Sequence, residues 1–202
     1  MERGARLRIL SCLLLAISAA AAGKVFLSQE EALRLAFPGA AVERRTAFLT
    51  AAQQKAVQKD TGSDRPPGAL VTYYAATRDG HDVGTAYFDT HLVRTQPETL
   101  MVVVLPTGVV GRIEVLSFSE PEEYLPRERW YAQFSGRALD DELAMRRGIH
   151  AVSGATLTAR ATTEAARRVL AIHRALHPAQ ASNPWLGSAS ACSCSPCSPE
   201  WP

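Results

Sequence analysis

The stretch TLMVVVLPTGVVGRIEVLSF, from Thr99 to Phe118, decides the fold class. Its first part, Thr99 to Leu105, is a continuous apolar run bounded by turn residues, which favours a central strand. Pro106-Thr107-Gly108 is a turn signal. The chain then continues as a second apolar strand from Val109 to Phe118. Together the two strands predict an antiparallel hairpin.

A second hairpin precedes the first. Ala69 to Thr77 is rich in Val, Thr and Tyr, Arg78-Asp79-Gly80 is a turn signal, and Val83 to Phe88 is the predicted partner strand. Two hairpins in series predict an antiparallel sheet from Ala69 to Phe118. A weaker pattern predicts a short strand over Val42 to Leu49.

Helices are predicted on both sides of this sheet. Ser28 with Glu31 and Thr50 with Gln53 are capping-box patterns, each of which opens a short helix. Further helices are predicted over Arg127 to Phe134, from Asp140 or Asp141 to Gly148, and, the longest, from about Thr158 to Leu176. Helices, a meander and then more helices predict an α+β fold, in which an antiparallel sheet of hairpins packs against helices.

Length, composition and charge set the class of protein. The 202 residues are enough for one domain with a sizeable core. Without the three arginines and one glutamate of residues 1–23, nineteen basic and nineteen acidic side chains remain. A neutral domain has no electrostatic footprint for nucleic acid, so no nucleic-acid partner is expected.

The N-terminus, residues 1–23, has the pattern of a signal peptide. Arg3, Arg6 and Arg8 precede an apolar segment that ends in Ala20-Ala21-Ala22, a small-residue cleavage pattern. The apolar run is shorter than the roughly 20 residues of a spanning helix, although an uncleaved membrane anchor is the alternative interpretation. The pattern predicts export, to the periplasm or the outer face of the cytoplasmic membrane.

The C-terminal residues 178–202 are rich in Ala, Ser, Pro and Cys and have few large apolar groups, which predicts a disordered tail. This tail holds Cys192, Cys194 and Cys197, so residues 24–177, the predicted folded domain, contain no cysteine. The three cysteines are either an incidental cluster or ligands for a soft metal ion.

The segment HAVSGATLT, from His150 to Thr158, carries the chemistry. Gly154 permits a positive φ and a close approach to a ligand, and Ala155 keeps that approach open. Hydroxyls of Ser153, Thr156 and Thr158 lie near the start of the long helix, where free amides and the helix dipole favour a phosphate. Ordinary helix capping is the alternative interpretation of these hydroxyls.

Ser153-Gly154-Ala155-Thr156-Leu157-Thr158 resembles the flavinylation motif of the FMN-binding domain family. That family includes flavin-carrying components of the sodium-translocating NADH:quinone reductase and of the Rnf complex. The resemblance extends from about Thr99 to Leu176. It implies that FMN is bound at this motif and is joined through its phosphate to Thr156. It also implies a separate flavin transferase, which attaches the FMN.

Two positions depart from the family pattern. His150 stands where the family usually has an aspartate, three residues before the serine, and the family's Glu-Thr-Pro-Gly loop is present only as Glu120-Pro121. We nevertheless include His150 and Glu120 among the cofactor-binding candidates. Of the nearby aromatic residues, Trp130 or Tyr124 is the preferred candidate to stack on the flavin ring, and packing in the core is the alternative.

The family resemblance and the export pattern together predict an electron carrier. The expected partners are membrane redox subunits or cytochromes, and the chain shows no dinucleotide fingerprint or obvious catalytic acid–base pair. The alternative is a non-redox module of the same fold, which binds a phosphate-bearing ligand reversibly or serves as a docking domain.

Overall fold

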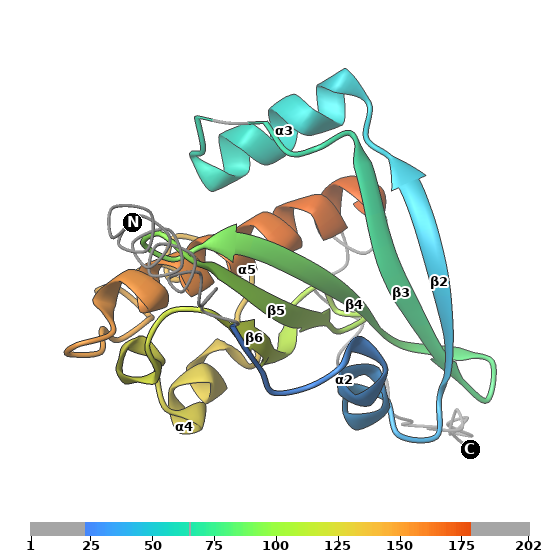
Figure 1. The fold of residues 1–202 in the computed structure, drawn as a ribbon. Helices are drawn as coiled ribbons and strands as arrows, with labels where there is room; N and C mark the ends of the chain where they lie inside the picture. The colour runs from blue at the N-terminus through green and yellow to red at the C-terminus, as the bar shows by residue number, and fades with distance from the viewer. Residues whose placement is uncertain (1–22, 65, 179–202) are drawn as a thin grey trace, which may run out of the picture.

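Six strands form one antiparallel sheet in the order β1-β6-β5-β4-β3-β2 (Figure 1). The computed structural model describes residues 23–64 and 66–178. The strands are β1 Lys24–Val25, β2 Ala41–Phe48, β3 Leu70–Arg78, β4 His81–Leu92, β5 Pro97–Val104 and β6 Val110–Phe118. The predicted hairpins and the α+β class are confirmed. The sheet is larger than the predicted span, because β1 pairs with β6 and β2 pairs with β3.

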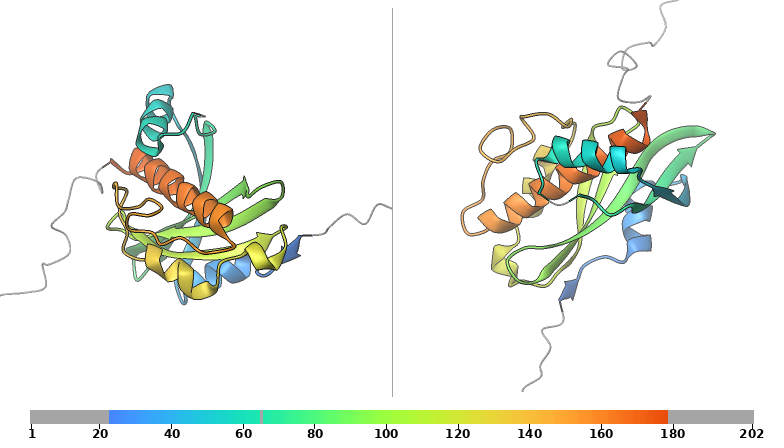
Figure 2. Two further views of the ribbon diagram at one scale, coloured as in Figure 1. Left: turned by 90° about the vertical axis from the view of Figure 1, so that its left-hand side faces the viewer. Right: turned by 90° about the horizontal axis from the view of Figure 1, so that it is seen from above.

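Helices cover both faces of the sheet. They are α2 Gln29–Ala36, α3 Ala51–Thr61, α4 Glu128–Tyr131 and α5 Thr156–Leu176, with 3-10 turns η1 Glu122–Tyr124 and η2 Ala132–Phe134. The long helix α5 crosses one face of the sheet, and α2 lies on the opposite face (Figure 2). The capping boxes at Ser28 and Thr50 are both formed.

Strand β5 is apolar throughout its second half because it is buried on both faces. Leu100, Val102 and Val104 belong to the cluster that packs against α5. Met101 and Val103 belong to the cluster that packs against α2. All five side chains are at most 3% exposed. The continuous run in the sequence is therefore the signature of a strand between two layers.

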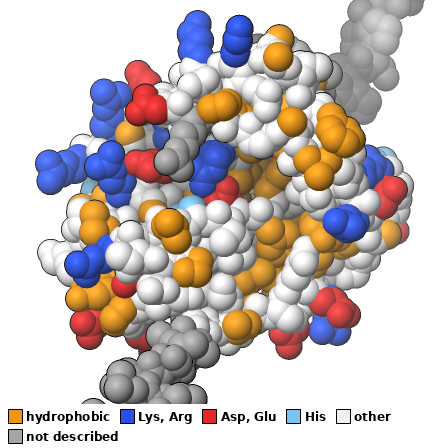
Figure 3. Space-filling view, turned by 45° about the horizontal axis from the view of Figure 1, so that its top comes forward, with side chains coloured by type: hydrophobic (Ala, Val, Ile, Leu, Met, Phe, Trp, Pro, Cys, Tyr) orange, Lys and Arg blue, Asp and Glu red, His pale blue; other side chains and the backbone are white. Residues whose placement is uncertain are grey.

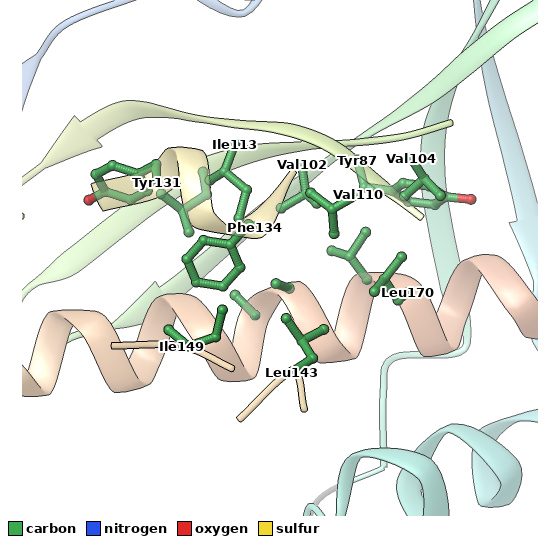
Figure 4. Packing of buried hydrophobic residues seen from close by; sticks show 14 of the residues in the cluster. Tyr87, Val102, Val104, Val110, Ile113, Tyr131, Phe134, Leu143, Ile149 and Leu170 are labelled. Carbon is green, nitrogen blue, oxygen red and sulfur yellow. The ribbon is translucent and has the colours of Figure 1, made fainter. Parts of the chain in front are cut away.

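The larger core lies between the sheet and α5 (Figure 4). Phe134, Leu143 and Ile149 come from the segments that connect β6 to α5, and all three are fully buried. On α5 itself, alanines such as Ala159 and Ala166 are also fully buried. Small side chains on this face let the helix lie close to the strands, and the larger residues of the connecting segments fill the remaining space.

The helix predicted from Asp140 or Asp141 to Gly148 is wrong. The segment consists of turns, in which Asp140 Oδ1 accepts hydrogen bonds from the backbone amides of residues 142 and 143. Arg146 has a φ of 65°, a left-handed conformation that an α-helix does not contain. Arg167 of α5 donates to the carbonyls of Asp140 and Leu143. Arg167, which is distant in the sequence, thus donates hydrogen bonds to carbonyls that would pair with neighbouring backbone amides in a helix.

The start of α5 also differs from the prediction. The helix begins at Thr156 instead of about Thr158, and Ala155 is its N-cap. The predicted signal peptide, except for Gly23, and the cysteine-containing tail from residue 179 lie outside the described residues. Among the residues that are described, none of the helices combines the length and apolar character needed to cross a membrane.

Gly84 generates a prediction about stability. It lies opposite Ala76, where the β3–β4 register shifts, and its φ is 142°. A Cβ atom at this position would lie 3.0 Å from the carbonyl oxygen of Val104 and 3.2 Å from the ring of Phe37. We expect Gly84→Ala to lower the free energy of unfolding by about 2 kcal/mol, measured by urea denaturation.

Gly68→Ala is the matched control. Its φ is not in the left-handed region, and the nearest atom to an added Cβ is 3.9 Å away. This substitution is expected to change the free energy of unfolding by less than about 1 kcal/mol. Equal effects at the two glycines would contradict our account of the β4 backbone.

Candidate functional site

The motif forms the loop that leads into α5. Gly154 has a φ of 85°, a conformation that favours glycine, and the space around its Cα is open. Ser153, Gly154, Thr156 and Leu157 are exposed, whereas Ala155 is buried. The loop therefore presents its backbone and two hydroxyl groups to solvent at the start of the helix.

The N-terminus of α5 has free hydrogen-bond donors. The first amides of an α-helix have no acceptor within the helix. Here the N-cap residue is Ala155, and no side-chain cap hydrogen bond is formed. The helix is 21 residues long, so its dipole adds a positive potential at the same point. Amides and dipole together fit a phosphate group at Thr156.

The structure distinguishes the two threonines of the motif. Thr156 is exposed, and its Oγ1 donates a hydrogen bond to the carbonyl of Val152 at 3.1 Å, which leaves the oxygen lone pairs free to accept. Thr158 is 1% exposed, and its Oγ1 donates to the carbonyl of Tyr124 at 2.5 Å. The hydrogen bond of Thr158 therefore connects α5 to η1, whereas Thr156 provides an accessible hydroxyl group at the start of α5.

Trp130 and Gln133 hold the motif loop in place. The indole Nε1 of Trp130 donates to the carbonyl of His150 at 2.8 Å, and the backbone amide of His150 donates to Gln133 Oε1 at 2.7 Å. Trp130 also makes edge-to-face contacts with Tyr131 and Phe134. It is 9% exposed, so most of its surface lies in the core.

Two pockets flank the start of α5. The first, which we call the Trp130 pocket, has a volume of about 640 Å³. Its lining includes Leu125, Arg127, Arg129, Trp130, Gln133, His150, Ser153 and Ala155. The second, the Met145 pocket, has a volume of about 440 Å³ and includes Met145, Arg146, Ala151, Thr156, Arg160 and Arg167. Both volumes are in the range of small-molecule and cofactor sites.

The other predicted candidates lie in different places. Glu120 Oε1 accepts hydrogen bonds from the backbone amides of Thr95 and Gln96, at 2.9 and 3.0 Å. The hydrogen bond from Thr95 contributes most to holding the pKa of Glu120 below its ordinary value. Glu120 thus closes the β4–β5 turn and is not among the residues that line either pocket. Leu157, beside Thr156, is 54% exposed.

Lys and Arg side chains gather on the left of the surface view, the side on which α5 begins (Figure 3). Arg127 and Arg129 line the Trp130 pocket, and Arg146 lines the Met145 pocket. The sequence alone does not single out these three residues. In the sequence their only signal is positive charge, which is common on protein surfaces.

A buried ionic network anchors α5 to the sheet. Arg168 donates two hydrogen bonds to Asp89, at 2.8 and 2.6 Å. His91 bridges Asp89, at 2.9 Å, and Glu98, at 3.1 Å. Burial alone would lower the pKa of His91, but the hydrogen bonds and charges of the two carboxylates raise it to about 9. The protonated imidazole is thus the favoured form at neutral pH.

Comparison with known protein families gives a match that includes this site. Residues 95–171 match the FMN-binding domain family. The matched stretch includes β6, α4, the motif and most of α5, and it confirms the family resemblance of the sequence. A search of curated proteins finds no match.

The position of Trp130 predicts that it controls the motif loop. Trp130→Phe removes the donor to the His150 carbonyl while an aromatic ring remains in the core. We expect a loss of about 1–2 kcal/mol in the free energy of unfolding and faster amide hydrogen exchange in residues 149–155. Tyr74→Phe is the control, because it removes the hydrogen bond from Gln29 on the opposite face of the sheet. An unchanged exchange rate in Trp130→Phe would refute this role.

The ionic network predicts a dependence of stability on pH. The folded-state pKa of His91, about 9, lies above its ordinary value of 6.5. Its stabilising effect is therefore complete below pH 6.5 and is lost as the pH rises through 9. Between pH 6.5 and pH 9, we expect the free energy of unfolding of the His91→Gln variant to fall by about 2 kcal/mol less than that of the wild-type protein. The measurement is denaturant titration at each pH. Equal pH dependence in both proteins would contradict the assignment.

Proposed function

Because residues 95–171 form an FMN-binding domain, we propose that the chain is an exported electron-transfer flavoprotein that carries FMN as a phosphoester on Thr156. The observation that carries this proposal is the exposed Thr156 hydroxyl at the uncapped N-terminus of α5. When bound, FMN would supply the electron transfer, which no side chain of the site performs by itself.

The residues present fit the phosphate of FMN. Free amides at the start of α5 would hold its oxygens, Gly154 would permit a close approach of the backbone, and Thr156 would provide the ester oxygen. The Trp130 pocket and the Met145 pocket lie on either side and share Ala151 in their linings, so each offers space for the rest of the cofactor.

Covalent attachment suits an exported carrier. A cofactor that is esterified to the chain is not lost by diffusion in a compartment open to the outside. We propose that a separate flavin transferase attaches the FMN, and that membrane redox subunits or cytochromes exchange electrons with it. Export rests on the arginine-flanked apolar segment of residues 1–23, and N-terminal sequencing of the protein from its native host tests it.

A second candidate function is reversible, non-redox binding of a phosphate-bearing ligand. The observation in its favour is His150, which replaces the carboxylate usual in the family. His150 lines the Trp130 pocket, and its backbone is bonded on both sides, to Gln133 and Trp130. A site without that carboxylate would bind the phosphate through the same helix amides but leave Thr156 unmodified.

The decisive prediction compares the two threonines of the motif. Thr156→Ala removes the exposed hydroxyl, and we expect complete loss of covalent flavin. Thr156→Ser keeps a hydroxyl and should retain part of it. Thr158→Ala removes the bond to Tyr124, so it should weaken the helix start without abolishing the modification. The measurement is intact mass and in-gel flavin fluorescence under denaturing conditions, after co-expression with a flavin transferase.

Two control variants distinguish the possible reasons for an unexpected result in the covalent flavin measurement. Ser153→Ala removes the other exposed hydroxyl of the loop and should leave the covalent bond in place. His150→Asp restores the family residue and should leave the modification unchanged or raise it. If the wild-type protein carries no covalent flavin but binds FMN reversibly, the second candidate function replaces the first. Flavin that persists in Thr156→Ala and is absent from Thr158→Ala would overturn the residue assignment.

A further inference from the structure

Strand β2 forms an open edge of the sheet. It stands last in the strand order of the described residues, and Figure 1 shows it at the right-hand margin, with the helices on its other side. Seven of its eight residues are exposed, and the other, Ala47, is partly buried. An edge strand presents a row of unpaired backbone donors and acceptors, which is a template for a further strand.

The register between β2 and β3 identifies the free backbone groups. Leu49 lies opposite Ala69, one step beyond the last paired residues of the two strands, and its N–H donates to the Ala69 carbonyl at 2.7 Å. In an antiparallel pair, residues that bond to the neighbouring strand alternate with residues whose N–H and C=O point away from it. The odd-numbered residues of β2 therefore bond to β3. The groups that point to the open edge belong to Val42, Arg44, Thr46 and Phe48.

The side chains of β2 suit an antiparallel copy of the same strand. Val42 and Phe48 lie near opposite ends of one face and are 37% and 75% exposed. On the other face, Arg45 forms an ion pair with Glu43 at 2.7 Å. An antiparallel copy centred on Arg45 places Val42 opposite Phe48 at both ends. It also brings two Glu43–Arg45 pairs together at the centre, where two positive and two negative charges are diagonal neighbours.

We propose that β2 is a dimerisation edge, to which a second copy of this chain adds its own β2 in antiparallel orientation about a two-fold axis at Arg45. The interface is isologous, because both copies contribute the same strand. It joins two six-stranded sheets into one continuous sheet and pairs all four free residues of each edge.

Other registers fit less well. A shift of two residues in one direction places Arg44 opposite Arg44 of the second copy, and a shift in the other direction leaves Val42 beyond the overlap. Either shift loses one of the four backbone pairs. The start of α5 lies on the side of the domain away from β2, so the motif loops of both copies stay open (Figure 1). The dimer does not depend on FMN.

Sedimentation of the purified protein tests the association directly. We expect the mass to rise from that of one chain to that of two as the concentration increases to about 500 μM. The mass of a single chain throughout this range would overturn the proposal.

Thr46 tests the backbone pairing. Thr46→Pro removes an N–H that points to the open edge, where proline is tolerated. We expect the dimer dissociation constant to rise at least about tenfold, because each copy loses a hydrogen bond. Thr46→Val is the matched control, since it keeps the N–H and a β-branched side chain, and it should change the constant less than about twofold. Equal dissociation constants in the two variants would refute pairing through β2.

Charge substitutions test whether the partner is a second copy. The side chains of Glu43 and Arg45 are 67% and 48% exposed, so neither substitution disturbs the core. Arg45→Glu places four acidic groups at the axis, and Glu43→Arg places four basic ones, so each variant alone should be monomeric. An equal mixture should form a heterodimer. A mixture that stays monomeric, or a dimer in either variant alone, would contradict the proposal.

Amide hydrogen exchange distinguishes the second copy from another occupant of the edge. The amides of the four even-numbered residues should exchange more slowly as the dimer forms. The amides of Glu43, Arg45 and Ala47, which bond to β3, should be protected at every concentration. Protection of the even-numbered amides in the dilute monomer would show that another segment of this chain covers β2, and would overturn the proposal.

Discussion

The close packing of α5 against the sheet is the constraint on which the rest of the structure depends. Ala159, Ala165 and Ala166 are fully buried on the inner face of the helix, and their small side chains allow a short distance to the strands. The connecting segments between β6 and α5 then wrap around this contact and insert larger side chains, Phe134 and Leu143 among them. A helix fixed along its length also has a fixed N-terminus.

The ionic network and the hydroxyl pattern together set the rotation of α5 about its own axis. Arg168 donates two hydrogen bonds to Asp89, and this paired contact restricts rotation of α5 about its own axis. Side chains two positions apart along an α-helix are separated by about 200° around the helix axis. When Thr158 points inward to the carbonyl of Tyr124, Thr156 must point outward. The exposure of one hydroxyl is thus a consequence of the burial of the other.

The elements with local signals were predictable from the sequence. The strands of the hairpins and the two capping boxes follow from periodicity and from residues three apart. The turns of residues 140–148 were not predictable, because Arg167, about 25 positions later, satisfies their carbonyls. The motif was found from its glycine and hydroxyls, but the Trp130 bond to the loop spans 20 residues and has no local signal.

The ionic network likewise could not be predicted from local patterns in the sequence. His91 and Glu98 are seven residues apart on neighbouring strands, and their pairing depends on the β4–β5 register. No pattern in the sequence distinguishes these groups from the charged residues of a solvent-exposed strand. The same holds for Glu120, whose hydrogen bonds to the β4–β5 turn depend on the position of the chain after β6.

The alanine at the N-cap of α5 has a consequence for the life of the protein in the cell. A helix start without a side-chain cap lacks about 1 kcal/mol of stabilisation that Ser, Thr, Asp or Asn would supply. An anion bound to the open amides would make up for that loss, because a ligand that binds only the native state stabilises it. Because proteases degrade unfolded chains, a copy with such a ligand would be degraded more slowly than a copy without one. Under the proposed function, the missing cap would therefore couple attachment of the flavin to the turnover of the protein.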